Sequence, residues 1–217
     1  MTLATALRPL AWAAGLIPLA MILWAAEHHR LGPDTYRGLT TETGVWTIWL
    51  LCGTLVVTPL RRLTGWNEVI GYRRTLGLLA FFYGTLHFLA YLIFDRFAGL
   101  EFQGGASWWK TAADLTSYTA ADIIQRPFLA IGFVSFLIMV PLAASSSPGM
   151  IRRLGGRRWR HLHRFVYAAA ITGLLHHWWP LADRFRLDSY SAVLSILFAF
   201  RIYRARTHAR PMAWSVH

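Results

Sequence analysis

Three histidines lie inside long apolar stretches of the sequence: His87, His163 and His176. An ionisable side chain in such a stretch is costly, so it is by default a sign of function. Two neutral imidazoles from different helices can fill both axial positions of a six-coordinate b-type haem. Iron held in this way exchanges electrons and keeps no open position for a substrate. The histidines therefore predict haem binding and electron transfer.

The composition favours helices that cross a membrane. Of the 217 residues, 55% are hydrophobic and 15% are aromatic. A hydrocarbon core of about 30 Å is crossed by roughly 20 apolar residues in a helix. We expect a single all-α integral membrane domain over residues 1–217, built as a haem-binding bundle of six transmembrane helices. The expected spans are Leu10–Ala26, Gly44–Leu60, Leu76–Phe94, Pro127–Ala144, Leu162–Pro180 and Ser189–Tyr203.

The net charge of +12 is distributed in a way that indicates membrane topology rather than binding to nucleic acid. Fifteen of the 22 Lys and Arg residues lie in the N-terminus, the second and fourth connections and the tail, whereas nine of the ten acidic residues lie elsewhere. Because positive residues accumulate on the cytoplasmic side, both termini are predicted to be cytoplasmic. Leu10–Ala26 could also be a cleaved signal peptide, but the consistent charge pattern favours six retained spans.

Depth in the membrane pairs two of the three histidines. His87 lies twelve residues beyond Thr75, which corresponds to about 18 Å from the cytoplasmic end of its span. His163 lies near the inner face, and His176 lies about 20 Å farther along the same span. We therefore expect His87 to pair with His176 in the outer half of the bilayer. His163 could bind a second haem or a flavin-side group, with no partner identified on the third span.

The neighbouring histidine, His177, is an alternative to His176. Thirteen residues at about 100° each leave His163 and His176 about 140° apart around a straight helix, whereas His177 nearly eclipses His163. A kink at Gly173 or a bulged turn could bring His176 back into line. Spacing alone leaves the choice between the two open.

Four segments resemble, in their order and spacing, the MsrQ (YedZ) family of haem-binding membrane subunits, within the ferric-reductase-like transmembrane superfamily. They cover most of the chain from the second to the fifth span: VVTPL at 56–60, RRTLGLLAFFYGTLHFLAY at 73–91, IIQRPFLAIGFVSF at 123–136 and RRWRHLHRFVYAAAITGLLHHWW at 157–179. The resemblance places the family's histidines at His87, His163 and His176, and so favours His176 over His177.

The resemblance implies a bacterial inner-membrane electron-transfer subunit, which is not itself the catalytic subunit. It would carry haem b and FMN and pass electrons to a periplasmic molybdopterin-containing methionine-sulfoxide reductase that repairs oxidised periplasmic proteins. The quinone pool or a cytoplasmic flavin reductase would supply the electrons. No Gly-rich dinucleotide fingerprint follows a strand in this sequence, so the reductant must come from outside the chain.

Arginines at the cytoplasmic rim could hold the phosphate of a flavin or the propionates of haem, because a guanidinium binds oxyanions in a bidentate fork. The candidates are Arg73, Arg74 and Arg164. Two other functions stay open on the sequence. One is a self-sufficient transmembrane ferric reductase or quinol-oxidising cytochrome b, and the other is a haem-free transporter or assembly factor whose histidines bind a metal or relay protons.

Overall fold

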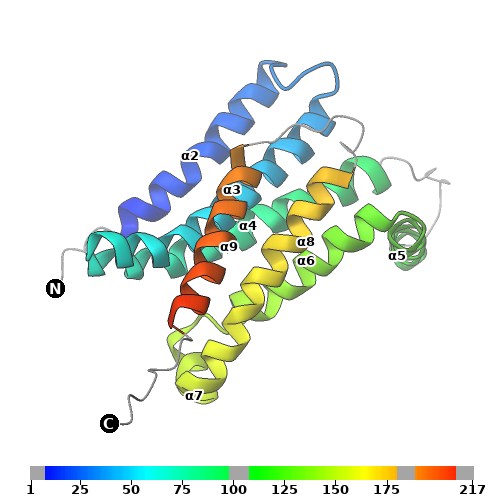
Figure 1. The fold of residues 1–217 in the computed structure, drawn as a ribbon. Coiled ribbons are helices and arrows are strands. Elements are labelled where there is room, and N and C mark those ends of the chain that lie inside the picture. The colour runs from blue at the N-terminus through cyan, green and yellow to red at the C-terminus, as the bar shows by residue number, and fades with distance from the viewer. Residues whose placement is uncertain (1–7, 98–107, 180–188, 209–217) are drawn as a thin grey trace, which may run out of the picture.

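The computed structural model describes residues 8–97, 108–179 and 189–208, and these residues form helices without any β-strand (Figure 1). The all-α expectation is therefore confirmed for the described residues. The helices are α2 (Arg8–Glu27), α3 (Thr35–Thr64), η1 (Asn67–Gly71), α4 (Tyr72–Ala90), η2 (Tyr91–Phe97), α5 (Trp108–Gln125), α6 (Pro127–Ala144), α7 (Pro148–Leu162), η3 (His163–Phe165), α8 (Val166–Trp178) and α9 (Ser189–His208).

Four helical segments of the described chain are long and apolar enough to cross a membrane, and they correspond to the first four predicted spans. They are Pro9–Glu27, Thr35–Thr64, Asn67–Arg96 and Pro127–Ala144. α8 has 13 residues and the apolar part of α9 is confined to Ser191–Tyr203, so both are shorter than the roughly 20 residues that span a bilayer. The fifth and sixth spans stay predictions. Pro180 and both chain termini lie outside the described residues.

α3 begins well before the predicted second span. The Asp34 carboxylate caps its first turn by accepting hydrogen bonds from the backbone N–H groups of Tyr36 and Arg37. The helix ends at Gly65, whose φ of 72° is the left-handed conformation that glycine adopts most easily. The added N-terminal turns are polar, so hydropathy could not reveal them. They supply the backbone that one of the histidines contacts.

The predicted fifth span is not one straight helix. α7 ends at Leu162, a 3₁₀ turn (η3) follows, and α8 begins at Val166. Each residue of a 3₁₀ turn advances by about 120° rather than 100°, so the angular count from His163 to His176 does not hold. α8 continues through Gly173 as one α-helix. The change in winding occurs before it, at η3.

The helices pack as two pairs, α3 against α4 and α6 against α8, and α9 lies across α3 (Figure 1). The buried side chains between them form one apolar core, which includes Leu55, Ala80, Ala169 and Leu194. The alanines among them let the helix axes approach closely, as is typical of packing within membranes.

α2 is attached to α4 by the fully buried Tyr83. Its hydroxyl donates to the Gly15 carbonyl at 2.8 Å and accepts from the Leu19 backbone N–H at 2.9 Å. These two backbone groups are four residues apart, so the hydroxyl bonds to both ends of one helical turn of α2. α2 is therefore an integral part of the bundle.

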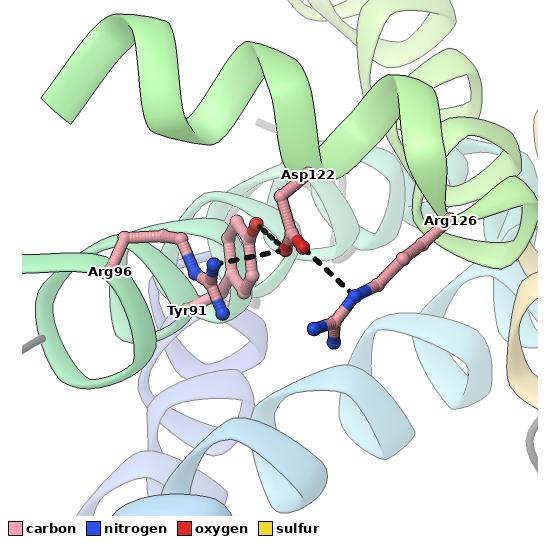
Figure 2. Close-up of polar contacts among 4 residues, drawn as sticks. All are labelled: Tyr91, Arg96, Asp122 and Arg126. Carbon is pink, nitrogen blue, oxygen red and sulfur yellow. Dashed lines mark hydrogen bonds and ion pairs between the residues drawn. The ribbon is translucent and has the colours of Figure 1, made fainter. Parts of the chain in front are cut away.

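α5 is a helix that the sequence interpretation assigned to an outer connection. Its Asp122 is buried and accepts a hydrogen bond from the Tyr91 hydroxyl at 2.7 Å (Figure 2). The same carboxylate pairs with Arg126 at 2.8 Å and with Arg96 at 3.4 Å. Tyr91 and Arg96 lie in η2, and Arg126 directly precedes α6. The Asp122 carboxylate therefore joins α5, η2 and the start of α6 at one end of the bundle.

Unpaired positive charge in the described part of the chain is concentrated at one end of the bundle. α7 lies there and carries Arg152, Arg153, Arg157, Arg158 and Arg160, whereas α5 lies at the other end, where Asp122 offsets the charge of Arg96 and Arg126 (Figure 1). By the positive-inside bias, the α7 end is expected to face the cytoplasm.

Cysteine labelling in whole cells tests this orientation. In a Cys52→Ala background, we expect Lys110→Cys on α5 to react with a membrane-impermeant maleimide in spheroplasts. Arg157→Cys on α7 should react only after permeabilisation. Both positions are exposed, so access to the reagent depends on the side of the membrane. The reverse pattern would contradict the predicted topology.

Removal of the Asp122 charge should destabilise the α5 end. Asp122→Asn leaves two arginines close together without their shared carboxylate, and a lost charged hydrogen bond of this kind costs about 1–3 kcal/mol. We expect a lower midpoint of thermal unfolding in detergent. Asp114→Asn, on the same helix and partly exposed, is the matched control. An equal effect in both variants would contradict a specific role for the Asp122 cluster.

Candidate cofactor site

His87 from the last turn of α4 and His176 from the last turn of α8 face each other across the bundle. Their ring centroids are 5.9 Å apart and the ring planes are inclined by 74°. An iron atom bonded to both rings at about 2 Å per nitrogen would hold the centroids about 6 Å apart. The spacing of the two imidazoles is therefore compatible with a metal atom between them.

Hydrogen bonds fix which nitrogen of each ring is free. His87 Nδ1 lies 2.7 Å from the carbonyl oxygen of Thr40, and His176 Nδ1 lies 2.7 Å from that of Phe128. A carbonyl oxygen only accepts, so both Nδ1 atoms carry the proton and donate it. In the neutral ring Nε2 then holds a lone pair. This is the usual state of a metal-binding histidine whose other nitrogen donates to a backbone carbonyl.

The donor set fits haem better than a metal held by protein ligands alone. Among the described residues, no group of three or more His, Cys, Asp or Glu side chains is arranged to hold a metal ion. Two histidines are too few for such a site, whereas a porphyrin supplies four further nitrogens. Phe128 stacks beside His176 with ring centroids 6.0 Å apart and adds an aromatic wall.

His163 lies apart from this pair, in the 3₁₀ turn η3 that joins α7 to α8. Its Nε2 is 3.1 Å from the hydroxyl oxygen of Ser145, and its ring lies 4.0 Å from that of Trp159. Trp159 Nε1 donates to the Ser145 carbonyl at 3.1 Å, which fixes the same corner from the other side. The structure thus brings together His87 and His176 and leaves His163 near the α7 end.

The arginine candidates also lie toward the α7 end. Arg73 is partly buried at the start of α4, while Arg74 and Arg164 are exposed. None of the three has a described contact with His87 or His176. A guanidinium is a cation that binds oxyanions and does not ligate iron.

Arg201 is a further candidate for binding an anionic group. The sequence interpretation missed it, because it was counted among the cations of the tail. Its Nη2 donates to the Leu55 carbonyl at 2.9 Å, and its guanidinium lies 4.8 Å from the centre of the Tyr167 ring. Its Nη1 is buried without a hydrogen-bond partner in the described part of the chain. The sequence feature that could have identified it is an arginine inside the apolar stretch LSILFAFRIY.

Residues 43–174 match the protein family described as "Ferric reductase like transmembrane component". This range includes His87, His163 and the three candidate arginines, and it ends two residues before His176. No solved structure matches the chain. Its curated relatives include proteins named "Protein-methionine-sulfoxide reductase heme-binding subunit MsrQ" from three bacteria.

The relatives match over nearly their whole length. The Ralstonia nicotianae protein is 45% identical, and the alignment covers 91% of this chain and 85% of that protein. The Bordetella pertussis protein is 39% identical over 94% of each chain. The Herminiimonas arsenicoxydans protein is 36% identical, over 93% of this chain and 86% of its own. The chain therefore belongs to the ferric-reductase-like transmembrane family and, within it, to the MsrQ subunits.

Proposed function

We propose that this membrane protein is the haem b electron-transfer subunit of a methionine-sulfoxide reductase system, with His87 and His176 as the axial ligands. The observation that carries this proposal is the pair of imidazoles 5.9 Å apart, each of which donates Nδ1–H to a helix carbonyl. When bound there, haem b would supply one-electron transfer. The names of the relatives support the same assignment.

The residues around the pair would orient the ligands and exclude water. The Thr40 and Phe128 carbonyls keep each ring in the Nδ1–H tautomer and make each Nε2 a better donor to iron. If both imidazoles held the haem iron, no open position would be left on the metal for a substrate. This arrangement suits an electron carrier that is not the catalytic subunit.

The α7 end is proposed as the side where electrons enter. Arg73, Arg74 and Arg164, together with Arg201, would hold an anionic phosphate or propionate there. FMN and a second haem at His163 are both proposals for this end, supported by the cationic surroundings and by the resemblance of the sequence. The donor would be the quinone pool or a cytoplasmic flavin reductase.

The electron acceptor would be a periplasmic molybdopterin-containing methionine-sulfoxide reductase, reached from the α5 end of a subunit in the bacterial inner membrane. The names of the relatives describe a subunit of a reductase, which implies a catalytic partner. Electrons would leave on this side because His87 and His176 lie in the last turns of α4 and α8, and α4 continues into η2, next to α5.

Absorption spectra of single variants test the ligand assignment. The protein purified in detergent should show low-spin b-type bands that sharpen on reduction with dithionite. His87→Ala and His176→Ala should each lose the haem of this site in a pyridine haemochrome count. His177→Ala, one residue farther on the same helix, is the matched control and should keep it. Full haem content in both ligand variants would overturn the assignment, and a fall in His163→Ala would indicate a second haem.

Reoxidation of the reduced protein tests the electron acceptor. After reduction with limiting dithionite, we expect the reduced b-type bands to decay rapidly only when the periplasmic reductase and methionine sulfoxide are both present. The control reaction contains methionine sulfoxide without the reductase. Equally rapid decay with a ferric chelate and no partner would instead favour a self-sufficient ferric reductase, the activity that the name of the wider family suggests.

A further inference from the structure

The two histidines are held in the same way by two different helices. His87 donates to the carbonyl of Thr40 in α3, and His176 donates to the carbonyl of Phe128 in α6. In each helix a glycine follows the accepting residue at a distance of four: Gly44 after Thr40 and Gly132 after Phe128. The same arrangement therefore occurs once for each histidine.

Neither glycine has room for a side chain. A Cβ atom at Gly44 would lie 2.9 Å from Nδ1 and 3.0 Å from Cε1 of His87. A Cβ atom at Gly132 would lie 2.6 Å from Nδ1 and 2.8 Å from Cε1 of His176. In both cases the clash is with the ring itself, and a ring held by a hydrogen bond cannot retreat without lengthening that bond.

The spacing of four residues has a simple cause. In an α-helix the carbonyl of residue i points toward the backbone N–H of residue i+4, and the side chain of residue i+4 lies close to it. A glycine at i+4 exposes the second lone pair of that carbonyl to a group from another helix. The imidazole can then bind a carbonyl that already accepts a hydrogen bond within its own helix.

We infer that Gly44 and Gly132 are positioning residues for the two histidines. By lacking side chains, they let each imidazole reach a helix carbonyl, which fixes its tautomer with the lone pair on Nε2. As far as haem is concerned, this inference rests on the proposed function. The fit between each glycine and its histidine can be tested without haem.

The inference predicts an effect on electron affinity. A strong hydrogen bond from Nδ1 gives the imidazole more anionic character, which stabilises ferric iron and lowers the reduction potential. An alanine at Gly44 or Gly132 would push the ring away from its carbonyl and weaken this bond. The reduction potential should therefore rise in the alanine variants.

Other glycines of the same bundle supply matched controls. A Cβ atom at Gly53, also in α3, would come no closer than 3.7 Å to Leu76. One at Gly77, in α4, would come no closer than 3.9 Å to Thr54. Both are ordinary contact distances. Gly53→Ala and Gly77→Ala make the same chemical change in these helices without touching a histidine.

A double-mutant cycle on thermal unfolding in detergent tests the contact directly. We expect Gly44→Ala to lower the unfolding midpoint of the full-length protein by roughly 5 °C. In a His87→Ala background the same change should have no cost, since the ring that it strikes is gone. Gly132→Ala should behave likewise against His176→Ala. Equal destabilisation in both backgrounds would overturn the inference, because the glycines would then serve general helix packing.

Poor accumulation of a glycine variant is also informative. If Gly44→Ala fails to fold, the Gly44→Ala/His87→Ala double variant should accumulate again, because it removes the clash. Failure of the double variant, with His87→Ala itself folded, would contradict the inference.

Redox titration and EPR of the haem-loaded protein form the second arm. We expect an upward shift of the reduction potential in Gly44→Ala and Gly132→Ala and none in Gly53→Ala. The low-spin ferric EPR signal reports the angle between the imidazole planes, which is 74° here, and should change in the same two variants. Unchanged potentials and EPR signals in folded variants would overturn the inference. Full haem in the histidine variants would instead overturn the proposed function and leave the thermal cycle valid.

Discussion

The organisation of this bundle depends on two hydrogen bonds, from His87 to the Thr40 carbonyl and from His176 to the Phe128 carbonyl. In an apolar interior no water replaces a lost partner, so an unpaired imidazole N–H would be costly. Each bond joins the two helices of a packed pair, α3 with α4 and α6 with α8. The facing rings lie where the two pairs meet, and the core of small and branched residues holds the pairs in register.

The segments beyond the histidines stabilise the same meeting point. Tyr91 lies one helical turn after His87, and Arg126 directly precedes the helix that supplies the Phe128 carbonyl. Asp122 binds both side chains, so its carboxylate connects the end of α4, which carries His87, to the start of α6 (Figure 2). The π-helix η2, which begins at Tyr91, widens the turn there, and such local widening is common beside functional sites.

The sequence predicted the apolar helices better than their ends or their partners. Pro127–Ala144 matches α6 at both ends, because Pro127 starts the helix and apolar residues fill it. α3 extends to Thr35 through polar turns, and α5 mixes polar and apolar residues, so neither feature gives a hydropathy signal. The stretch from Leu162 to Pro180 reads as one span because hydropathy does not detect a 3₁₀ turn.

The sequence by itself determined that the chain forms apolar helices, that its charges are segregated, and that histidines occur at matching depths on two of those helices. These properties follow from residue type and spacing along one segment. Helix spacing left His176 and His177 as alternatives, and the tertiary structure brings His176 to His87. Only the tertiary structure decided which groups bind the two Nδ1 atoms. The accepting carbonyls are 47 and 48 residues away in the sequence and carry no side-chain signal. Their position is set by the register between packed helices, and that register depends on where a glycine leaves room for a ring.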